Sequence, residues 1–130
     1  MPQKNLKVLL IEDNPGDALL IKELLSDTGN YKFDLVTVDR LDKGVSKLQE
    51  EKIDLVLLDL ALPDCLGLNS FTKLHTKAPG VPVIILSGDD DEIIALNAVQ
   101  DGAFDYLIKG QTDRKKLISS VSSAVEAYSV

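Results

Sequence analysis

The stretch from Ile53 to Gly67 reads Ile-Asp-Leu-Val-Leu-Leu-Asp-Leu-Ala-Leu-Pro-Asp-Cys-Leu-Gly, and the interpretation of the whole chain depends on it. Its aliphatic run reaches Asp59, and Pro63 and Gly67 follow closely. This pattern predicts a strand buried on both faces of a parallel sheet, whose carboxyl end opens into a loop. Ligands bind at that edge of open α/β sheets. An isolated Asp at such a position often only caps a turn, so a role for Asp59 needs support from elsewhere in the chain.

The same alternation of an aliphatic run and a helical pattern recurs along the chain. Strands are predicted at residues 6–11, 33–38, 53–59, 81–86 and 104–108. Helices are predicted from Pro15 to a stop at Gly29, over 41–48 and 68–78, from the acidic cluster 89–92 to Val99, and over 117–125. Gly44 weakens the second helix. The alternation predicts an α/β fold with a doubly wound parallel sheet, and its even spacing favours the flavodoxin-like strand order 2-1-3-4-5 with five helices.

Length and charge restrict the classes of protein to be considered. The 130 residues suit one domain, 1–130, and the net charge of -7 argues against binding to nucleic acid or to an anionic membrane. No apolar stretch reaches the roughly 20 residues that cross a bilayer, and the N-terminus lacks a signal peptide. The single cysteine, Cys65, cannot form an internal disulfide. We therefore expect a cytoplasmic protein.

Polar residues follow four of the predicted strands. With the strand order above, Glu12, Asp13 and Asp59 converge at one edge of the sheet, and an all-oxygen set of this kind suits Mg²⁺. Ser87 and Lys109 end two further strands and could hold anionic oxygens. Carboxylates, a cation, a hydroxyl and an ammonium together favour phosphoryl transfer, with Asp59 as the nucleophile. His75, the only histidine, lies in a helix and is interpreted as an ordinary helix residue.

Over essentially its whole length the chain resembles the receiver domains of two-component response regulators, in the single-domain form typical of chemotaxis regulators. The resemblance is carried by Glu12-Asp13, by Asp59 in Asp-Leu-Ala-Leu-Pro-Asp-x-x-Gly, by Ser87-Gly88, and by Tyr106-x-x-Lys109. It implies that Asp59 accepts a phosphoryl group from a sensor histidine kinase or a phosphotransfer protein. The domain would then catalyse only its own phosphorylation and dephosphorylation.

The resemblance also implies roles for the surrounding residues. Mg²⁺ would be bound at Asp59 and Asp13, by Glu12 through water, and by the backbone carbonyl of Ala61. Ser87 and Lys109 would hold the phosphoryl group, and Tyr106 would change rotamer with Ser87. Ala61 and Asp89 would flank the path of the water that removes the phosphoryl group.

The resemblance further implies an output face on the fourth helix, fifth strand and fifth helix. Small or apolar surface candidates there are Ile94, Ala95 and Ala98, and residues 114–116 are basic. A downstream protein target would bind this face, and the domain would be a monomer or a phosphorylation-dependent dimer.

One departure from the family and two alternatives remain. The family usually has a cis proline after its lysine, but Gly110 stands here, and the sequence leaves the conformation of the Lys109–Gly110 peptide open. A phosphatase of the haloacid dehalogenase type would also use Asp and Mg²⁺, but it would need a second Asp where this chain has Ala61. A degenerate receiver that only binds partners is disfavoured by the complete set of site residues. A flavodoxin-like FMN carrier would need a Ser/Thr/Gly-rich phosphate loop after the first strand, and a dinucleotide enzyme would need Gly-x-Gly-x-x-Gly there, but this chain has Glu12-Asp13-Asn14-Pro15.

Overall fold

The fold is built on a five-stranded parallel sheet. The computed structural model describes residues 4–26, 31–88 and 91–128. The strands are β1 (Lys4–Ile11), β2 (Tyr31–Val38), β3 (Leu55–Asp59), β4 (Val83–Ser87) and β5 (Asp105–Ile108). They lie in the order β2-β1-β3-β4-β5, and each neighbouring pair is parallel. The predicted flavodoxin-like order is therefore confirmed.

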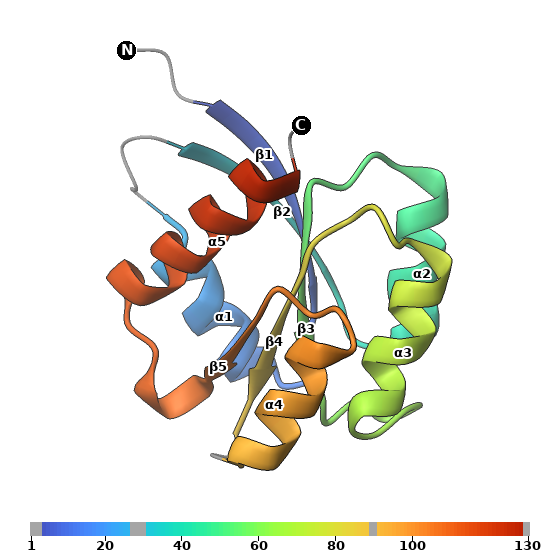
Figure 1. The fold of residues 1–130 in the computed structure, drawn as a ribbon. Helices are drawn as coiled ribbons and strands as arrows, with labels where there is room; N and C mark the ends of the chain where they lie inside the picture. The colour runs from blue at the N-terminus through green and yellow to red at the C-terminus, as the bar shows by residue number, and fades with distance from the viewer. Residues whose placement is uncertain (1–3, 27–30, 89–90, 129–130) are drawn as a thin grey trace.

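Helices cover both faces of this sheet (Figure 1). They are α1 (Pro15–Leu24), α2 (Leu41–Glu50), α3 (Leu68–Lys77), α4 (Glu92–Gln100) and α5 (Arg114–Tyr128), and the 3₁₀ turn η1 (Lys109–Gln111) follows β5. Helices α1 and α5 pack with one face of the sheet, whereas α2, α3 and α4 pack with the other. None of the described helices is long and apolar enough to cross a membrane.

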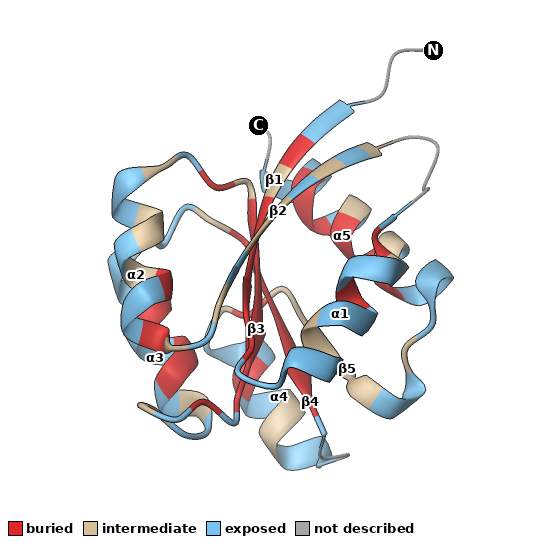
Figure 2. Cartoon of the chain, turned by 180° about the vertical axis from the view of Figure 1, so that it is seen from behind, coloured by how far each residue is buried: buried red, intermediate tan, exposed pale blue. Residues whose placement is uncertain are grey.

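The central strands are buried on both sides, as their aliphatic sequences require (Figure 2). Every residue of β3 and β4 is buried, including the terminal Asp59 and Ser87. The side chains that alternate along the strands form two cores, one beneath each helical layer. Since the apolar strand ends are fixed by both cores, the polar residues that follow them occupy defined positions at the carboxyl edge.

The helix boundaries follow from local capping chemistry. The Asn14 side chain accepts hydrogen bonds from the amides of Gly16 and Asp17, and Pro15 occupies the first turn of α1. Asp91 caps α4 in the same way. Helix α1 ends at Leu24, earlier than predicted, and the predicted stop at Gly29 lies outside the described residues.

Gly44 is buried in α2 at a point where this helix lies very close to β1. A Cβ at this position would overlap the side chain of Ile11, the last residue of β1. Gly44 therefore lowers the intrinsic stability of α2 but allows this helix to pack closely against Ile11, the residue before Glu12.

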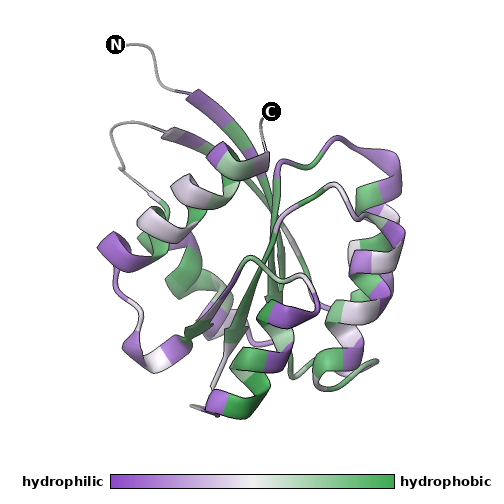
Figure 3. Cartoon of the chain, viewed as in Figure 1, coloured by the Kyte–Doolittle hydropathy of each residue, from purple (hydrophilic) through white to green (hydrophobic). Residues whose placement is uncertain are grey.

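The prediction for the surface of α4 is wrong in one respect. Ala98 is fully buried and Ile94 is half-buried against the core, whereas Ile93, Leu96 and Val99 are 72%, 59% and 48% exposed. Helix α4 is apolar on several sides, so its sequence does not determine which side meets the sheet. The ribbon of α4 accordingly carries hydrophobic colour along much of its length (Figure 3).

Candidate functional site at the carboxyl edge of the sheet

The predicted acidic cluster forms where β1 and β3 end side by side. Ile11 and Leu58 are partners in the parallel ladder, so the residues that follow them, Glu12 and Asp59, are neighbours. Both are only 3% exposed, whereas Asp13 is exposed. One carboxylate oxygen from each of the three residues lies within 4.8 Å of the other two. The sheet therefore brings the three predicted acidic residues together.

Lys109 reaches this cluster from the end of β5. Its Nζ lies 2.7 Å from Glu12 Oε1, 2.9 Å from Asp17 Oδ2 and 3.2 Å from Asp59 Oδ1. The side chains of Lys109, Glu12 and Asp59 are 19%, 1% and 4% exposed, so these three groups interact in an environment with little water. The Lys109–Gly110 peptide, whose conformation the sequence left open, is trans, since the described residues contain no cis peptide bond. Lys109 thus neutralises part of the charge around Asp59.

Asp17 is a member of the site that the sequence analysis missed. It lies in the first turn of α1 and its carboxylate accepts a hydrogen bond from Lys109, which is 92 residues away in the chain. An acidic residue in a first helical turn is ordinarily explained by the helix dipole alone. The available signal was its position four residues after Asp13, on the turn that returns toward the sheet edge.

The electrostatics of the cluster favour the binding of positive charge. Burial raises the pKa of Glu12 to about 9, and the adjacent Asp59 carboxylate adds to this rise, although Lys109 opposes it. Burial lowers the pKa of Lys109, but its bonds to Glu12 and Asp17 outweigh that effect, and the pKa is raised. The Lys109 ammonium lowers the pKa of Asp17. Three carboxyl groups, those of Glu12, Asp17 and Asp59, therefore share one ammonium.

The residues present fit a hard divalent cation. The donors are all carboxylate oxygens, which Mg²⁺ prefers, and no histidine belongs to the cluster. Glu12 Oε2 is buried and has no hydrogen-bond partner among the described residues. The three carboxylate oxygens lie within 4.8 Å of one another, so one cation between them would be close to all three residues.

Three of the remaining predicted residues lie on β4, on β5 and in the loop after β3. Ser87 is buried at the end of β4, directly after Leu86, the ladder partner of Asp59. Tyr106 is half-buried on β5, opposite Ile85. Ala61 is exposed in the loop after β3. Asp89 lies outside the described residues, so its predicted position is not tested.

A doubly wound parallel sheet with clustered carboxylates and a lysine at its carboxyl edge is typical of α/β domains whose functional site lies at that edge. Comparison with known proteins is more specific, since residues 8–122 match the response regulator receiver domain. The chain belongs to this family, as the resemblance implied.

Individual relatives agree with this assignment. The chain is 32% identical over 126 residues to the transcriptional regulatory protein GlrR of Escherichia coli, and the match covers 97% of the chain. It is 35% identical over 104 residues, or 80% of the chain, to the cell cycle transcriptional regulator CtrA of Caulobacter vibrioides. The matched regions make up only 28% and 44% of these two relatives.

A solved receiver domain from Clostridium thermocellum has the same fold. It superposes with a TM-score of 0.82 and 28% identity, and the match covers 94% of this chain and 95% of that one. The chain is therefore a response regulator receiver domain, a class of signalling switch.

Proposed function

We propose that the domain accepts a phosphoryl group on Asp59 from a phosphohistidine of a sensor histidine kinase or phosphotransfer protein. The observation that carries this proposal is the position of Asp59. Its buried carboxylate lies 3.2 Å from Lys109 and within 4.8 Å of the oxygens of Glu12 and Asp13. A carboxylate nucleophile beside an ammonium and a cation site is suited to receive a group that carries negative charge.

The transfer exchanges one bond for another. A carboxylate oxygen of Asp59 attacks the phosphorus, and the phosphorus–nitrogen bond of the phosphohistidine breaks. The leaving imidazole keeps the electron pair, and a proton on its second nitrogen leaves it neutral. Asp59 then carries a phosphoryl group with about two negative charges, which the site must compensate.

Lys109 and Ser87 are the residues that we assign to that compensation. Lys109 already contacts Asp59, so an ion pair with the new phosphoryl oxygens requires only a small movement of its ammonium. Ser87 ends the strand adjacent to β3 and can donate its hydroxyl proton to the same group. Tyr106 on the next strand would follow a displacement of Ser87, which makes these two residues the switch.

Glu12, Asp13, Asp59 and the carbonyl of Ala61 are the proposed Mg²⁺ ligands, with Glu12 acting through water. When bound, Mg²⁺ neutralises the charge of the phosphoryl group during transfer. The carboxylates of this chain position the cation, and Lys109 moves from them to the phosphoryl oxygens.

We propose that output uses the surface of α4, β5 and α5. The exposed Ile93, Leu96 and Val99 on α4 lie in a single patch of i, i+3 and i+6 positions. The basic residues 114–116 begin α5. A downstream protein, or a second copy in a phosphorylation-dependent dimer, would contact this surface. We propose no direct nucleic-acid or membrane contact, a cytoplasmic location, and one receiver domain over 1–130.

The proposal is tested with acetyl phosphate and Mg²⁺, which should add the mass of one phosphoryl group to the intact protein. The label should be lost in Asp59→Asn and with EDTA. Asp54→Asn is the matched control, since Asp54 precedes the same strand at its opposite end. Labelling that persists in Asp59→Asn would refute the proposal. Rapid catalytic turnover of phosphate esters would favour a phosphatase, and no labelling at all would favour a degenerate receiver.

A further inference from the structure

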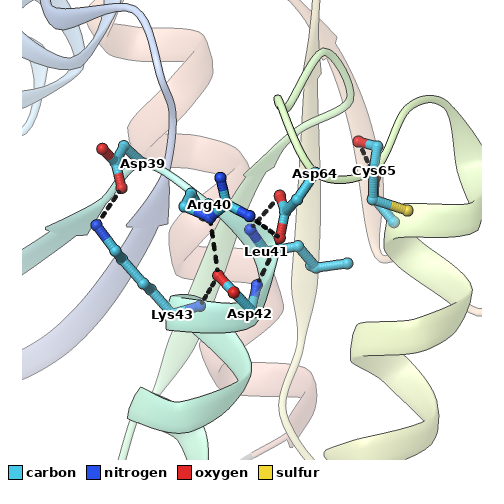
Figure 4. A network of polar contacts seen from close by, with 8 residues as sticks. Asp39, Arg40, Leu41, Asp42, Lys43, Asp64 and Cys65 are labelled. Carbon is cyan, nitrogen blue, oxygen red and sulfur yellow. Dashed lines mark hydrogen bonds and ion pairs between the residues drawn. The ribbon is translucent and has the colours of Figure 1, made fainter.

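The carboxylate of Asp64 connects the loop after Asp59 to a helix that precedes it in the chain. Asp64 Oδ1 accepts a hydrogen bond from the amide of Leu41 at 2.9 Å, and Oδ2 accepts one from the amide of Asp42 at 3.1 Å (Figure 4). The Asp64 side chain is only 15% exposed. Burial raises the pKa of its carboxyl group, but the two amides outweigh this effect, and the pKa is lowered.

These bonds take the place of a local helix cap. Arg40 occupies the N-cap position of α2 in extended conformation, but an arginine side chain has no acceptor for the free amides. Asp64 supplies that acceptor from 23 residues away. Arg40 Nη2 lies 4.0 Å from Asp64 Oδ2 and adds weak attraction.

The loop that carries Asp64 is also closed on itself and tied to α3. The amide of Gly67 donates to the carbonyl of Leu60 at 2.9 Å, and Ala61 forms a β-bridge with Leu66. Gly67 has φ of 69°, a conformation that favours glycine. Ser70 Oγ donates to the carbonyl of Cys65 at 2.9 Å. Residues 60–67 thus form a closed loop whose link to α2 is made by Asp64.

We propose that Asp64 is a positioning residue that holds this closed loop against α2, and so sets the position of the Ala61 carbonyl beside Asp59. The consequence for the cation rests on the proposed function, whereas the tether itself does not. The loop begins directly after Asp59, so a displacement at Asp64 reaches Ala61 through only two intervening residues.

Two variants distinguish the role of Asp64 as a cap of α2 from its role as a tether of the loop. Asp64→Ala removes both functions. Arg40→Ser combined with Asp64→Ala restores a local N-cap, because a serine at this position accepts from the second or third helical amide. It does not restore the connection to the loop. Asp39→Asn is a control of equal charge change, since Asp39 pairs with exposed Lys43 at the same helix end.

Amide hydrogen exchange in cation-free protein provides the first readout. In Asp64→Ala we expect exchange at Asp42 and Gly67 to accelerate by about tenfold, the effect of losing a typical cap. In the double variant, exchange at Asp42 should recover while Gly67 remains fast. Asp39→Asn should change neither amide. The proposed tether would be overturned if slow exchange returned at Gly67 as well as at Asp42 in the double variant. It would also be overturned if the exchange rate at Gly67 were unchanged in Asp64→Ala.

Mg²⁺ titration by calorimetry provides the second readout. We expect about tenfold weaker Mg²⁺ binding in Asp64→Ala and no recovery in the double variant, since loss of a residue that orients a metal ligand typically costs 10- to 100-fold in metal affinity. If the double variant binds Mg²⁺ with wild-type affinity, Asp64 does not position the loop for the cation. If wild-type protein binds no Mg²⁺, the proposed function fails, and the exchange at Gly67 still decides whether the tether exists.

Discussion

The raised pKa of Glu12 predicts that Mg²⁺ binding depends steeply on pH. With a pKa of about 9, roughly 1% of Glu12 is ionised at pH 7 in the cation-free protein. A cation favours the ionised form, so its binding at pH 7 should release about one proton. The affinity should then rise about tenfold for each pH unit between 6.5 and 8.5, and level off above 9. The variant Glu12→Gln cannot ionise and should lose this dependence.

Calorimetric titration in buffers of different ionisation enthalpy measures both the affinity and the number of protons released. Glu50→Gln, an exposed carboxylate on α2, is the matched control and should keep the wild-type slope. Glu12→Gln should bind more weakly than wild type at pH 9 but release no proton at pH 7. A flat wild-type profile, or the same slope in Glu12→Gln, would refute the electrostatic reasoning.

The raised pKa of Glu12 also affects the stability of the protein in the absence of a cation. The pKa of Glu12 is higher in the folded than in the unfolded protein, so its contribution is fully present below about pH 4.3 and is lost as pH rises through 9. Glu12→Gln should therefore become more stable relative to wild type as pH increases over that range. Urea denaturation at pH 5 and pH 9 measures the difference, and an opposite trend would contradict the assigned direction.

Three further predictions concern other parts of the site. Lys109→Gln should destabilise the cation-free protein by about 1–3 kcal/mol, because the carboxylates of Asp17 and Asp59 lose their counter-charge. In urea denaturation Mg²⁺ should restore part of this loss, whereas Lys52→Gln on the surface should not destabilise the protein. Ala61→Asn should accelerate loss of the phosphoryl group at least severalfold, because the added amide orients the attacking water. Asp89→Ala should also alter the rate of loss. The decay of a radiolabelled phosphoryl group measures both rates, and unchanged decay in both variants would contradict this proposal. Leu96→Glu on α4 should abolish phosphorylation-dependent partner binding or dimerisation in light scattering without altering labelling of the domain, and unchanged association would exclude this surface.

The sequence was sufficient to predict the sheet and the clustering of Glu12, Asp13 and Asp59 at its carboxyl edge. Aliphatic runs that end in polar residues identified the strands, and parallel order then required Glu12 and Asp59 to lie side by side. The ion pairs of Lys109 with Glu12 and Asp59 follow from the same order, since β5 ends at the same edge. These predictions succeeded because burial on both faces leaves little choice of register.

The features that the sequence did not predict depend on contacts between residues far apart in the chain, or on a helix whose buried side its sequence does not identify. Asp17 and Asp64 each have an ordinary local explanation, and only the fold places them against Lys109 and α2. The prediction of which side of α4 faces solvent was wrong because apolar residues occur on several sides of this helix. Their periodicity therefore does not identify the buried side. Gly44 was interpreted as a weakness because its close approach to Ile11 depends on tertiary packing.

The central claim, that Asp59 is the phosphoryl acceptor, is tested most directly by locating the modification. Protein treated with acetyl phosphate and Mg²⁺ is reduced with borohydride, which converts an aspartyl phosphate to homoserine, and its peptides are sequenced by mass spectrometry. We predict homoserine at position 59 alone, and none when Mg²⁺ is omitted. Homoserine at position 12, 13 or 17 in place of position 59 would contradict the account.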